Sequence, residues 1–98
     1  MSFWVYILRC ADGSYYVGHT DDPEMRIAAH QSGVMAGYTR SRRPVQLAFA
    51  EEFASRDDAF LRERQIKSWS RRKKQALIEG DWDVLSRLSH THGSTGSP

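Results

Sequence analysis

Two tyrosines ten positions apart are the first residues of this sequence that could do chemistry. Tyr6 and Tyr16 lie on either side of a turn, within the stretch WVYILRCADGSYYVG. A phenol both donates and accepts hydrogen bonds, and its unperturbed pKa is near ~10. Two phenols on one face of a sheet could form a proton-handling site, whereas two on opposite faces would be ordinary half-buried strand residues.

The length of the turn between the tyrosines decides which arrangement holds. Aromatic and β-branched residues predict a strand on each side of Ala11-Asp12-Gly13. A two-residue loop would pair Tyr6 with His19 and send the phenols to opposite faces. A three-residue loop with Gly13 in the left-handed conformation would pair Tyr6 with Gly18 and put both phenols on one face. The residues alone leave both registers open.

A carboxylate in an apolar position is the second chemical feature. Ala59, Phe60 and Ile66 fall within about 120° of arc on a predicted helix, and Glu63 lies in the middle of that arc. Burying a carboxylate is costly unless something compensates for it. Glu63 therefore either pairs with Lys67 one turn further along, or points into a site and binds a cation.

Arg26 and His30 are four positions apart, so they share one face of a predicted helix. Asp22 and Pro23 have the residue types that begin such a helix, and Gly33 suits its end. The pair could hold a phosphate, or could form part of a solvated helix face. The sequence contains no phosphate-cradling glycine loop and no zinc spacing, and we expect no small-molecule organic cofactor.

Capping and turn residues predict the elements that must position these side chains, with Ser70 and Asp81 as caps before the last two helical segments and Gly80 near the end of the basic helix. After the two strands, the predicted elements are a helix over 23–32, a loop over 34–44, a strand over 45–53, a helix over 56–69, a basic helix from 71 to near 80 and a last turn or two through 88.

Basic residues are concentrated in two places, although the net charge of the chain is only +2. Seven bases and one acid lie between residues 59 and 78, and a second cluster lies in the preceding loop. This asymmetry favours a polyanion-binding face, and the alternative is a solvated helix surface. The bases concerned are Arg40, Arg42 and Arg43 in the loop, and Arg62, Arg64, Lys67, Arg71, Arg72, Lys73 and Lys74 in the helices.

Length and composition predict one folded domain. The chain has 98 residues, of which 40% are hydrophobic and 27% charged, as is ordinary for a globular domain. Its longest apolar run, from Phe3 to Leu8, is too short to cross a bilayer, and no signal peptide is evident. With the single cysteine, these features predict a cytoplasmic protein without a membrane partner. We expect a single domain over 1–89 and, because HTHGSTGSP lacks apolar anchors, a disordered tail over 90–98.

Taken together, these residues resemble the GIY-YIG nuclease superfamily, most closely its small single-domain bacterial members. The resemblance runs from about Phe3 to Lys74, and its motifs are specific as an ordered set. They stand as Val5-Tyr6-Ile7, Tyr16-Val17-Gly18, Arg26 and His30 in RIAAH, Tyr38-Thr39-Arg40 followed by Arg42-Arg43-Pro44, and Glu63 with Lys67 in AFLRERQIK.

The resemblance implies an α/β (α+β) domain with a three-stranded antiparallel sheet, in the order β-β-α-β-α-α, and helices packed around it. It implies a divalent-metal-dependent DNA endonuclease, directed to DNA structure or damage in repair or processing, with Mg²⁺ or Mn²⁺ bound by Glu63. It assigns catalysis to Tyr6, Tyr16, Arg26, His30 and Glu63, and contacts to flanking phosphates to Arg40, Arg42, Arg43, Lys67, Arg71, Arg72, Lys73 and Lys74.

In this interpretation Tyr6 is the general base, with its pKa lowered near the metal and Arg26, and Tyr16 is its orienting partner, or the two roles are exchanged. His30 either relays a proton or orients a tyrosine. Both phenols must then share one face beside Arg26 and Glu63 and open into one partly solvated pocket, which requires the three-residue loop. One departure from the superfamily is that many members carry an asparagine after the acid-bearing helix, and this sequence contains none. The alternatives are a non-catalytic or weakly catalytic nucleic-acid-binding module, and a docking domain whose basic helix meets an acidic partner.

Overall fold

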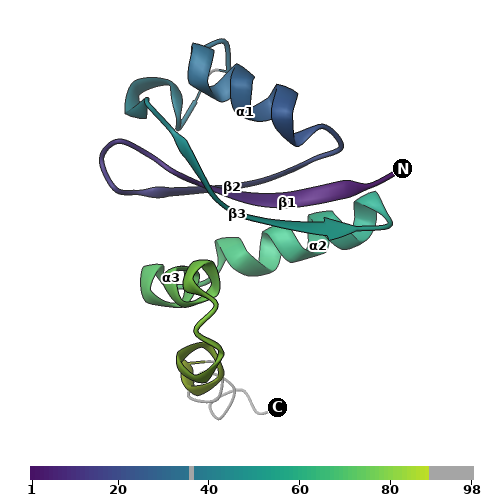
Figure 1. The fold of residues 1–98 in the computed structure, drawn as a ribbon, viewed down its shortest axis with the longest axis vertical. Helices are drawn as coiled ribbons and strands as arrows, with labels where there is room; N and C mark the ends of the chain where they lie inside the picture. The colour runs from purple at the N-terminus through teal and green to yellow at the C-terminus, as the bar shows by residue number, and fades with distance from the viewer. Residues whose placement is uncertain (36, 89–98) are drawn as a thin grey trace. The chain divides into compact units, whose positions relative to one another are not determined.

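A computed structural model describes residues 1–35 and 37–88 (Figure 1). The chain divides into two compact units, residues 1–67 and the residues from Ser68 onward, and each is described by itself. The single domain over 1–89 stays a prediction, and the predicted tail over 90–98 lies outside the described residues.

Unit 1 is built on a three-stranded antiparallel sheet. The strands are β1 (Phe3–Arg9), β2 (Tyr15–Thr20) and β3 (Gln46–Phe53), and their order in the sheet is β2-β1-β3. The central strand β1 is apolar on both faces, and its residues from Val5 to Leu8 are all buried. Because β1 lies in the middle of this order, β2 is an edge strand. The candidate site described below lies along this edge.

The β1–β2 hairpin has the register that a three-residue loop produces. Tyr6 lies opposite Gly18 and Leu8 lies opposite Tyr16. Cys10 N–H donates to the Ser14 carbonyl at 2.8 Å, and Gly13 N–H donates to the Cys10 carbonyl at 2.9 Å. Gly13 has a φ of 84°, a left-handed value that glycine adopts at little cost. The prediction of an odd-length loop is confirmed, and the two phenols lie on one face of the sheet.

Two helices cover the two faces of this sheet. α1 (Pro23–Ser32) lies on one face and α2 (Arg56–Lys67) on the other, as Figure 1 shows. α1 begins as predicted, because the Asp22 side chain accepts from the Met25 N–H at 3.2 Å, and it ends at Gly33 with a φ of 81°. A short 3₁₀ turn, η1 (Arg40–Arg42), lies in the predicted loop. The predicted fold class is confirmed.

The helix predicted over 56–69 ends two residues earlier than expected, and one of its expected apolar contacts is wrong. Ala59, Glu63 and Ile66 are its buried residues, whereas Phe60 is 42% exposed. The Phe60 ring lies against the His19 ring, with 5.6 Å between the ring centroids, and does not enter the core. The buried stripe of α2 is therefore narrower than the sequence pattern predicts, and its middle position is an acid.

Unit 2 contains the basic helix α3 (Arg71–Glu79). The Ser70 side chain accepts from the Lys73 N–H at 3.1 Å to begin α3, and Gly80, with a φ of 68°, ends it. Residues 82–88 are also helical, and the Asp81 carboxylate accepts from the Val84 N–H at 3.2 Å, as the capping prediction requires. Among the described residues, no helix has the length and apolar character needed to cross a membrane.

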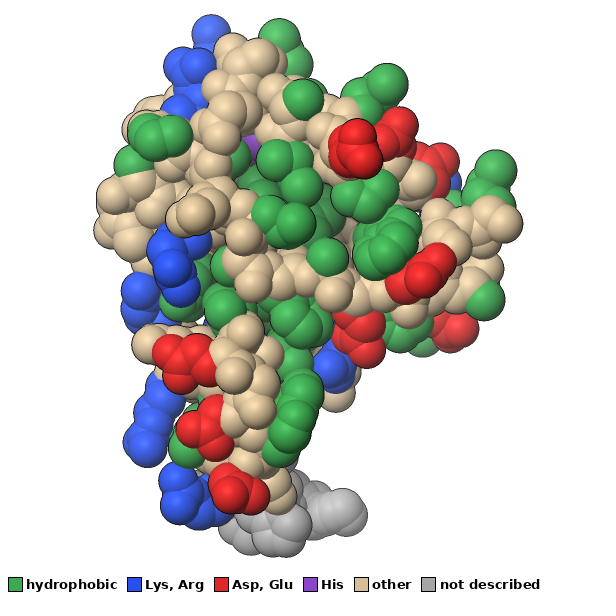
Figure 2. All heavy atoms as spheres, in the orientation of Figure 1, with side chains coloured by type: hydrophobic (Ala, Val, Ile, Leu, Met, Phe, Trp, Pro, Cys, Tyr) green, Lys and Arg blue, Asp and Glu red, His purple; other side chains and the backbone are tan. Residues whose placement is uncertain are grey.

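Charge is distributed unevenly along the sheet of unit 1. Figure 2 shows acidic side chains gathered over the end where β2 passes into α1 and β3 into α2. Basic side chains gather toward the opposite end, which carries η1 and the β1–β2 turn. On this face the positive charge is therefore greatest near the η1 end of the unit and the negative charge near the other.

Candidate active site

A buried chain of polar side chains starts at the first tyrosine. The Tyr6 hydroxyl lies 3.1 Å from His30 Nε2, and His30 Nδ1 lies 2.7 Å from Thr39 Oγ1. Tyr6, His30 and Thr39 are each 2% exposed or less. The Tyr16 ring lies beside this chain, with its centroid 6.3 Å from that of Tyr6 and 4.9 Å from that of His30. β1, β2, α1 and the loop before η1 thus each contribute one side chain.

Gly18 makes room for the Tyr6 ring. A Cβ at position 18 would lie 2.5 Å from the Tyr6 hydroxyl oxygen and 2.7 Å from its Cζ, closer than van der Waals contact allows. The ring therefore lies directly over the backbone of β2 and reaches the edge of the sheet. This is the physical reason for glycine at a strand position where its φ is not unusual.

In the protein by itself the pKa of Tyr6 is raised, and its lowering beside a metal and Arg26 stays a prediction. Burial, and then the neighbouring Tyr16, raise the pKa of Tyr6 to about 12, because together they outweigh the lowering effect of Arg26. Burial, and then the charge of Arg26, lower the pKa of His30. At neutral pH the phenol is therefore protonated and the imidazole neutral, so the pair is a hydrogen-bonded acid and base.

Glu63 reaches the site from the other face of the sheet. His19 pairs with Val5 across the hairpin, so its side chain lies on the face opposite to Tyr6. His19 Nδ1 bonds to Glu63 Oε1, and the Lys67 ammonium lies 2.6 Å from Glu63 Oε2. Burial by itself raises the pKa of Glu63, but Lys67 and His19 together lower it below its usual value. Glu63 is therefore a buried, ionised carboxylate, and the predicted i,i+4 pair with Lys67 is present.

The predicted single pocket for the phenols and the acid is wrong in two respects. Tyr6 is buried, so its hydroxyl does not open to solvent, whereas Tyr16 is half-buried. Glu63 approaches the edge strand from the α2 side, while the phenols lie on the α1 side. The charge of Glu63 nevertheless contributes to the raised pKa of Tyr6. The candidate site thus spans edge strand β2, with proton-handling groups on one side and a carboxylate on the other.

Arg26 places a cation beside the phenols. It comes one helical turn before His30 on α1, is half-buried, and places its charge beside Tyr6. A recess of about 350 Å³ lies next to it, with Met25, Ala29 and Met35 among its lining residues. Arg26 itself lines this recess, as do Asp21 and Asp22.

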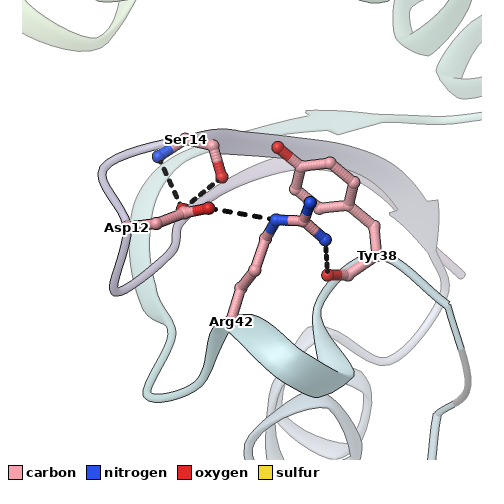
Figure 3. A network of polar contacts seen from close by, with 4 residues as sticks. All are labelled: Asp12, Ser14, Tyr38 and Arg42. Carbon is pink, nitrogen blue, oxygen red and sulfur yellow. Dashed lines mark hydrogen bonds and ion pairs between the residues drawn. The ribbon is translucent and has the colours of Figure 1, made fainter.

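The arginine loop is fixed to the hairpin turn by its own side chains. Figure 3 shows Arg42 between Asp12 and Tyr38. Its Nε donates to Asp12 Oδ2 at 3.0 Å, one amino group donates to the Tyr38 carbonyl at 2.8 Å, and the guanidinium lies 3.9 Å from the centroid of the Tyr38 ring. The Tyr38 ring in turn stacks on Tyr16, with 6.2 Å between centroids. This network holds the loop that presents Thr39 to His30.

The other predicted phosphate-contacting residues divide between the two units. Arg43 donates to the Arg40 carbonyl at 2.9 Å, so it contributes to the shape of the loop, while Arg40 and Lys67 are exposed. Arg71, Arg72, Lys73 and Lys74 form the first turn of α3. Four cations at the positive end of a helix dipole disfavour the helix, and a bound anion would relieve this repulsion.

Comparison with known proteins shows to which family this chain belongs. The model of the GIY-YIG catalytic domain matches residues 2–76, three quarters of the chain. The chain belongs to the GIY-YIG family. It is 43% identical over 89 residues to a UPF0213 protein of Bacillus pumilus, and the match covers 91% of this chain and 90% of that protein. A UPF0213 protein of Haloquadratum walsbyi is 48% identical over 81 residues, covering 83% of this chain and 91% of the other.

Two solved structures share this GIY-YIG fold. The solution NMR structure of a UPF0213 protein from Bacillus halodurans is 42% identical, with a TM-score of 0.54, and the match covers 91% of this chain and 98% of that one. The solution NMR structure of a protein from E. faecalis is 39% identical, with a TM-score of 0.58, over 82% and 85% of the two chains. The membership in a nuclease superfamily that the motifs predicted is thus confirmed.

Sequence reasoning missed two residues of this candidate site. His19 bonds to the acid, and Thr39 bonds to the histidine. Their sequence separations from these partners are 44 and 9 residues. The only signal for either residue in the sequence is its place in a motif, because His19 follows the second half-motif and Thr39 lies in the Tyr-Thr-Arg loop.

Proposed function

We propose that this protein is a divalent-metal-dependent DNA endonuclease that hydrolyses phosphodiester bonds, directed to DNA structure or damage, in DNA repair or processing. The strongest support is the arrangement across edge strand β2. Arg26 and the Tyr6–His30 pair lie on one side, and the ionised Glu63 lies on the other. A phosphodiester at this edge would meet the Arg26 cation and, once the edge rearranges, the hydrogen-bonded phenol and the metal-binding carboxylate.

The phenol side supplies phosphate binding and proton transfer. The planar fork of Arg26 can bind two phosphate oxygens and stabilise the charge that develops in the transition state. Tyr6 takes a proton from the attacking water while its own proton passes to His30 Nε2, 3.1 Å away. Because the pKa of Tyr6 is raised to about 12, free tyrosinate is scarce at neutral pH, and the two proton transfers occur together.

Access to Tyr6 sets a requirement on this mechanism. Tyr6 is buried in the free protein, so substrate binding must rearrange the β2 edge before water meets its hydroxyl. Tyr16, half-buried and stacked on Tyr38, is the phenol nearer to solvent. Separate Tyr6→Phe and Tyr16→Phe variants distinguish the base from its orienting partner, since loss of the base lowers kcat more than loss of the partner.

The residues around Glu63 fit a divalent metal of the Mg²⁺ type. The part of the chain that the structure describes has no group of three or more His, Cys, Asp or Glu that could hold a metal ion. Mg²⁺ commonly binds through one or two carboxylates, with water and substrate phosphates completing its coordination, and one ionised carboxylate meets that need. A bound Mg²⁺ or Mn²⁺ would stabilise charge on the scissile phosphate and the leaving oxygen.

Contacts to flanking phosphates would come from the basic residues. Arg40 and Lys67 are exposed on unit 1, and α3 supplies four consecutive bases on unit 2. Arg42 and Arg43, which also shape their loop, complete the proposed set. Such contacts position a nucleic acid without reading its bases, which agrees with a preference for DNA structure over sequence.

The decisive experiment measures cleavage and binding separately. Branched, nicked and intact duplex DNA are incubated with Mg²⁺, Mn²⁺ or EDTA, and affinity is measured by fluorescence anisotropy. We expect Glu63→Ala to abolish metal-dependent cleavage and to change DNA affinity by no more than a few-fold. Glu52→Ala, an exposed carboxylate on β3, is the matched control.

Two outcomes would contradict the proposal. Turnover by Glu63→Ala at the rate of the unmodified protein would show that Glu63 does not carry the metal. DNA binding without cleavage of any substrate, with either metal, would favour the alternative of a nucleic-acid-binding module, for which the absent asparagine is the sequence argument.

A further inference from the structure

The hydrogen bonds that join Tyr6, His30 and Thr39 can run in two directions, depending on which group donates in each bond. A neutral imidazole donates from one nitrogen and accepts at the other. His30 bonds to Tyr6 through Nε2 and to Thr39 through Nδ1, and either hydroxyl could be donor or acceptor. Two proton arrangements therefore satisfy the distances, and only one of them leaves Nε2 able to receive a proton.

The charge of Arg26 favours one of these arrangements. Arg26 acts on the Tyr6 oxygen as a neighbouring cation, and a cation favours a phenol oxygen that faces it with a lone pair and points its proton elsewhere. The hydroxyl proton of Tyr6 is then directed to His30 Nε2, which accepts it. His30 Nδ1 consequently carries the ring proton and donates to Thr39 Oγ1 at 2.7 Å. Burial of all three groups excludes water as a substitute partner for Nδ1.

We propose that Thr39 is a positioning residue that fixes His30 as the Nδ1–H tautomer and so keeps Nε2 ready to receive the Tyr6 proton. The inference rests on the proposed nuclease function for its catalytic consequence. In the hydrolytic step one water proton goes to the Tyr6 oxygen and the Tyr6 proton goes to His30 Nε2. The imidazolium so formed keeps its Nδ1–H bond to Thr39 and later returns its proton along the same path.

The first test observes the tautomer directly. Nitrogen-15 NMR of His30 distinguishes a protonated from an unprotonated ring nitrogen, and it needs no DNA, metal or turnover. We expect Nδ1 protonated and Nε2 unprotonated in the unmodified protein and in Thr39→Ser, which keeps the hydroxyl. In Thr39→Val, which has nearly the same shape without the hydroxyl, the population should shift toward the Nε2–H form. Thr20→Val, at another buried threonine, should leave the tautomer unchanged.

The second test measures the catalytic consequence. We expect Thr39→Val to lower kcat by about 10- to 100-fold with KM nearly unchanged, since general acid–base assistance is commonly worth about 10²–10⁴-fold. Thr39→Ser should restore kcat to within about threefold of the unmodified protein, because it restores the acceptor. A purely structural role of Thr39 would lower the folded fraction and leave kcat per folded molecule and the tautomer as they were.

The proposal fails if His30 carries its proton on Nε2 in the unmodified protein, or if Thr39→Val retains both the tautomer and kcat. These failures differ from failure of the proposed function. If the unmodified protein cleaves no DNA, the nuclease proposal falls while the NMR result still decides the tautomer. If it cleaves DNA and the tautomer does not depend on Thr39, only the inference about Thr39 falls.

Discussion

Gly18→Ala tests the close packing between β2 and the first tyrosine. The added Cβ would lie 2.5 Å from the Tyr6 hydroxyl oxygen, 2.7 Å from Cζ and 3.2 Å from Cε2, against the ~3.5–4.0 Å of ordinary carbon contacts. The ring must therefore move by about 1 Å, and it is buried without free space around it. Overpacking of this kind costs about 1–3 kcal/mol, and the reduced freedom of the unfolded chain offsets about 0.4–1 kcal/mol.

We therefore expect Gly18→Ala to lower the free energy of unfolding by roughly 1–2 kcal/mol. Urea denaturation measures this as a lower midpoint at unchanged slope. Displacing Tyr6 by about 1 Å also disrupts its bond to His30, and a displacement of that size can cost about 10²-fold in rate. Cleavage should fall by a similar factor if the proposed function holds.

A double-mutant cycle makes the reasoning refutable. In a Tyr6→Leu background the hydroxyl, Cζ and the rest of the ring are absent, so Gly18→Ala should become neutral or slightly stabilising there. The coupling free energy between the two positions should then equal most of the loss seen in the unmodified protein. An equal cost of Gly18→Ala in both backgrounds, or a gain in the unmodified protein, would show that the ring does not lie over Gly18 as described.

Three further predictions concern charge. Reversing the charges of Arg71, Arg72, Lys73 and Lys74 should weaken binding to every DNA sequence about equally. The slope of log affinity against log salt concentration should flatten by about one unit per lost phosphate contact. An unchanged slope would show that these residues form a solvated face. The lowered pKa of His30 means that the unfolded state takes up a proton at higher pH than the folded state, so the free energy of unfolding should fall as pH drops below ~6.5. Urea midpoints should show this in the unmodified protein and less in His30→Gln, and identical acid slopes would contradict it. Lys67→Met removes the ammonium that lies 2.6 Å from Glu63 Oε2. A Mn²⁺ titration should then show metal binding tightened by up to about fivefold, equivalent to about 1 kcal/mol. An unchanged Mn²⁺ affinity would argue against a metal at Glu63.

Local signals in the sequence predicted the elements well. The cap at Asp22, the glycine ends of two helices and the Ser70 cap are contacts over a few residues, and each is present. The hairpin register needed more, because the residues allowed two loops and the motif resemblance decided between them. The helix predicted through residue 69 ends at Lys67.

What the sequence could not predict depends on long-range packing. Periodicity placed Glu63 on the buried stripe of a helix, but not on the face of the sheet opposite to the phenols. That placement follows from which face α2 covers, and it brings His19 to Glu63 across 44 positions. The sequence could not predict the raised pKa of Tyr6 in the protein by itself for the same reason, since this direction follows from burial that only the packed α1 side creates.

The three-residue turn between β1 and β2 also limits how this protein can evolve. Side chains alternate along a strand, so a gain or loss of one residue at positions 11–13 that shifted the pairing by one would move Tyr16 to the α2 side and turn His19 away from Glu63. A change of two residues would preserve the side on which each group lies. Length variation at this exposed tip is therefore expected to occur in steps of two, even though the proposed metal ligand and the residues of the proton chain lie outside the turn.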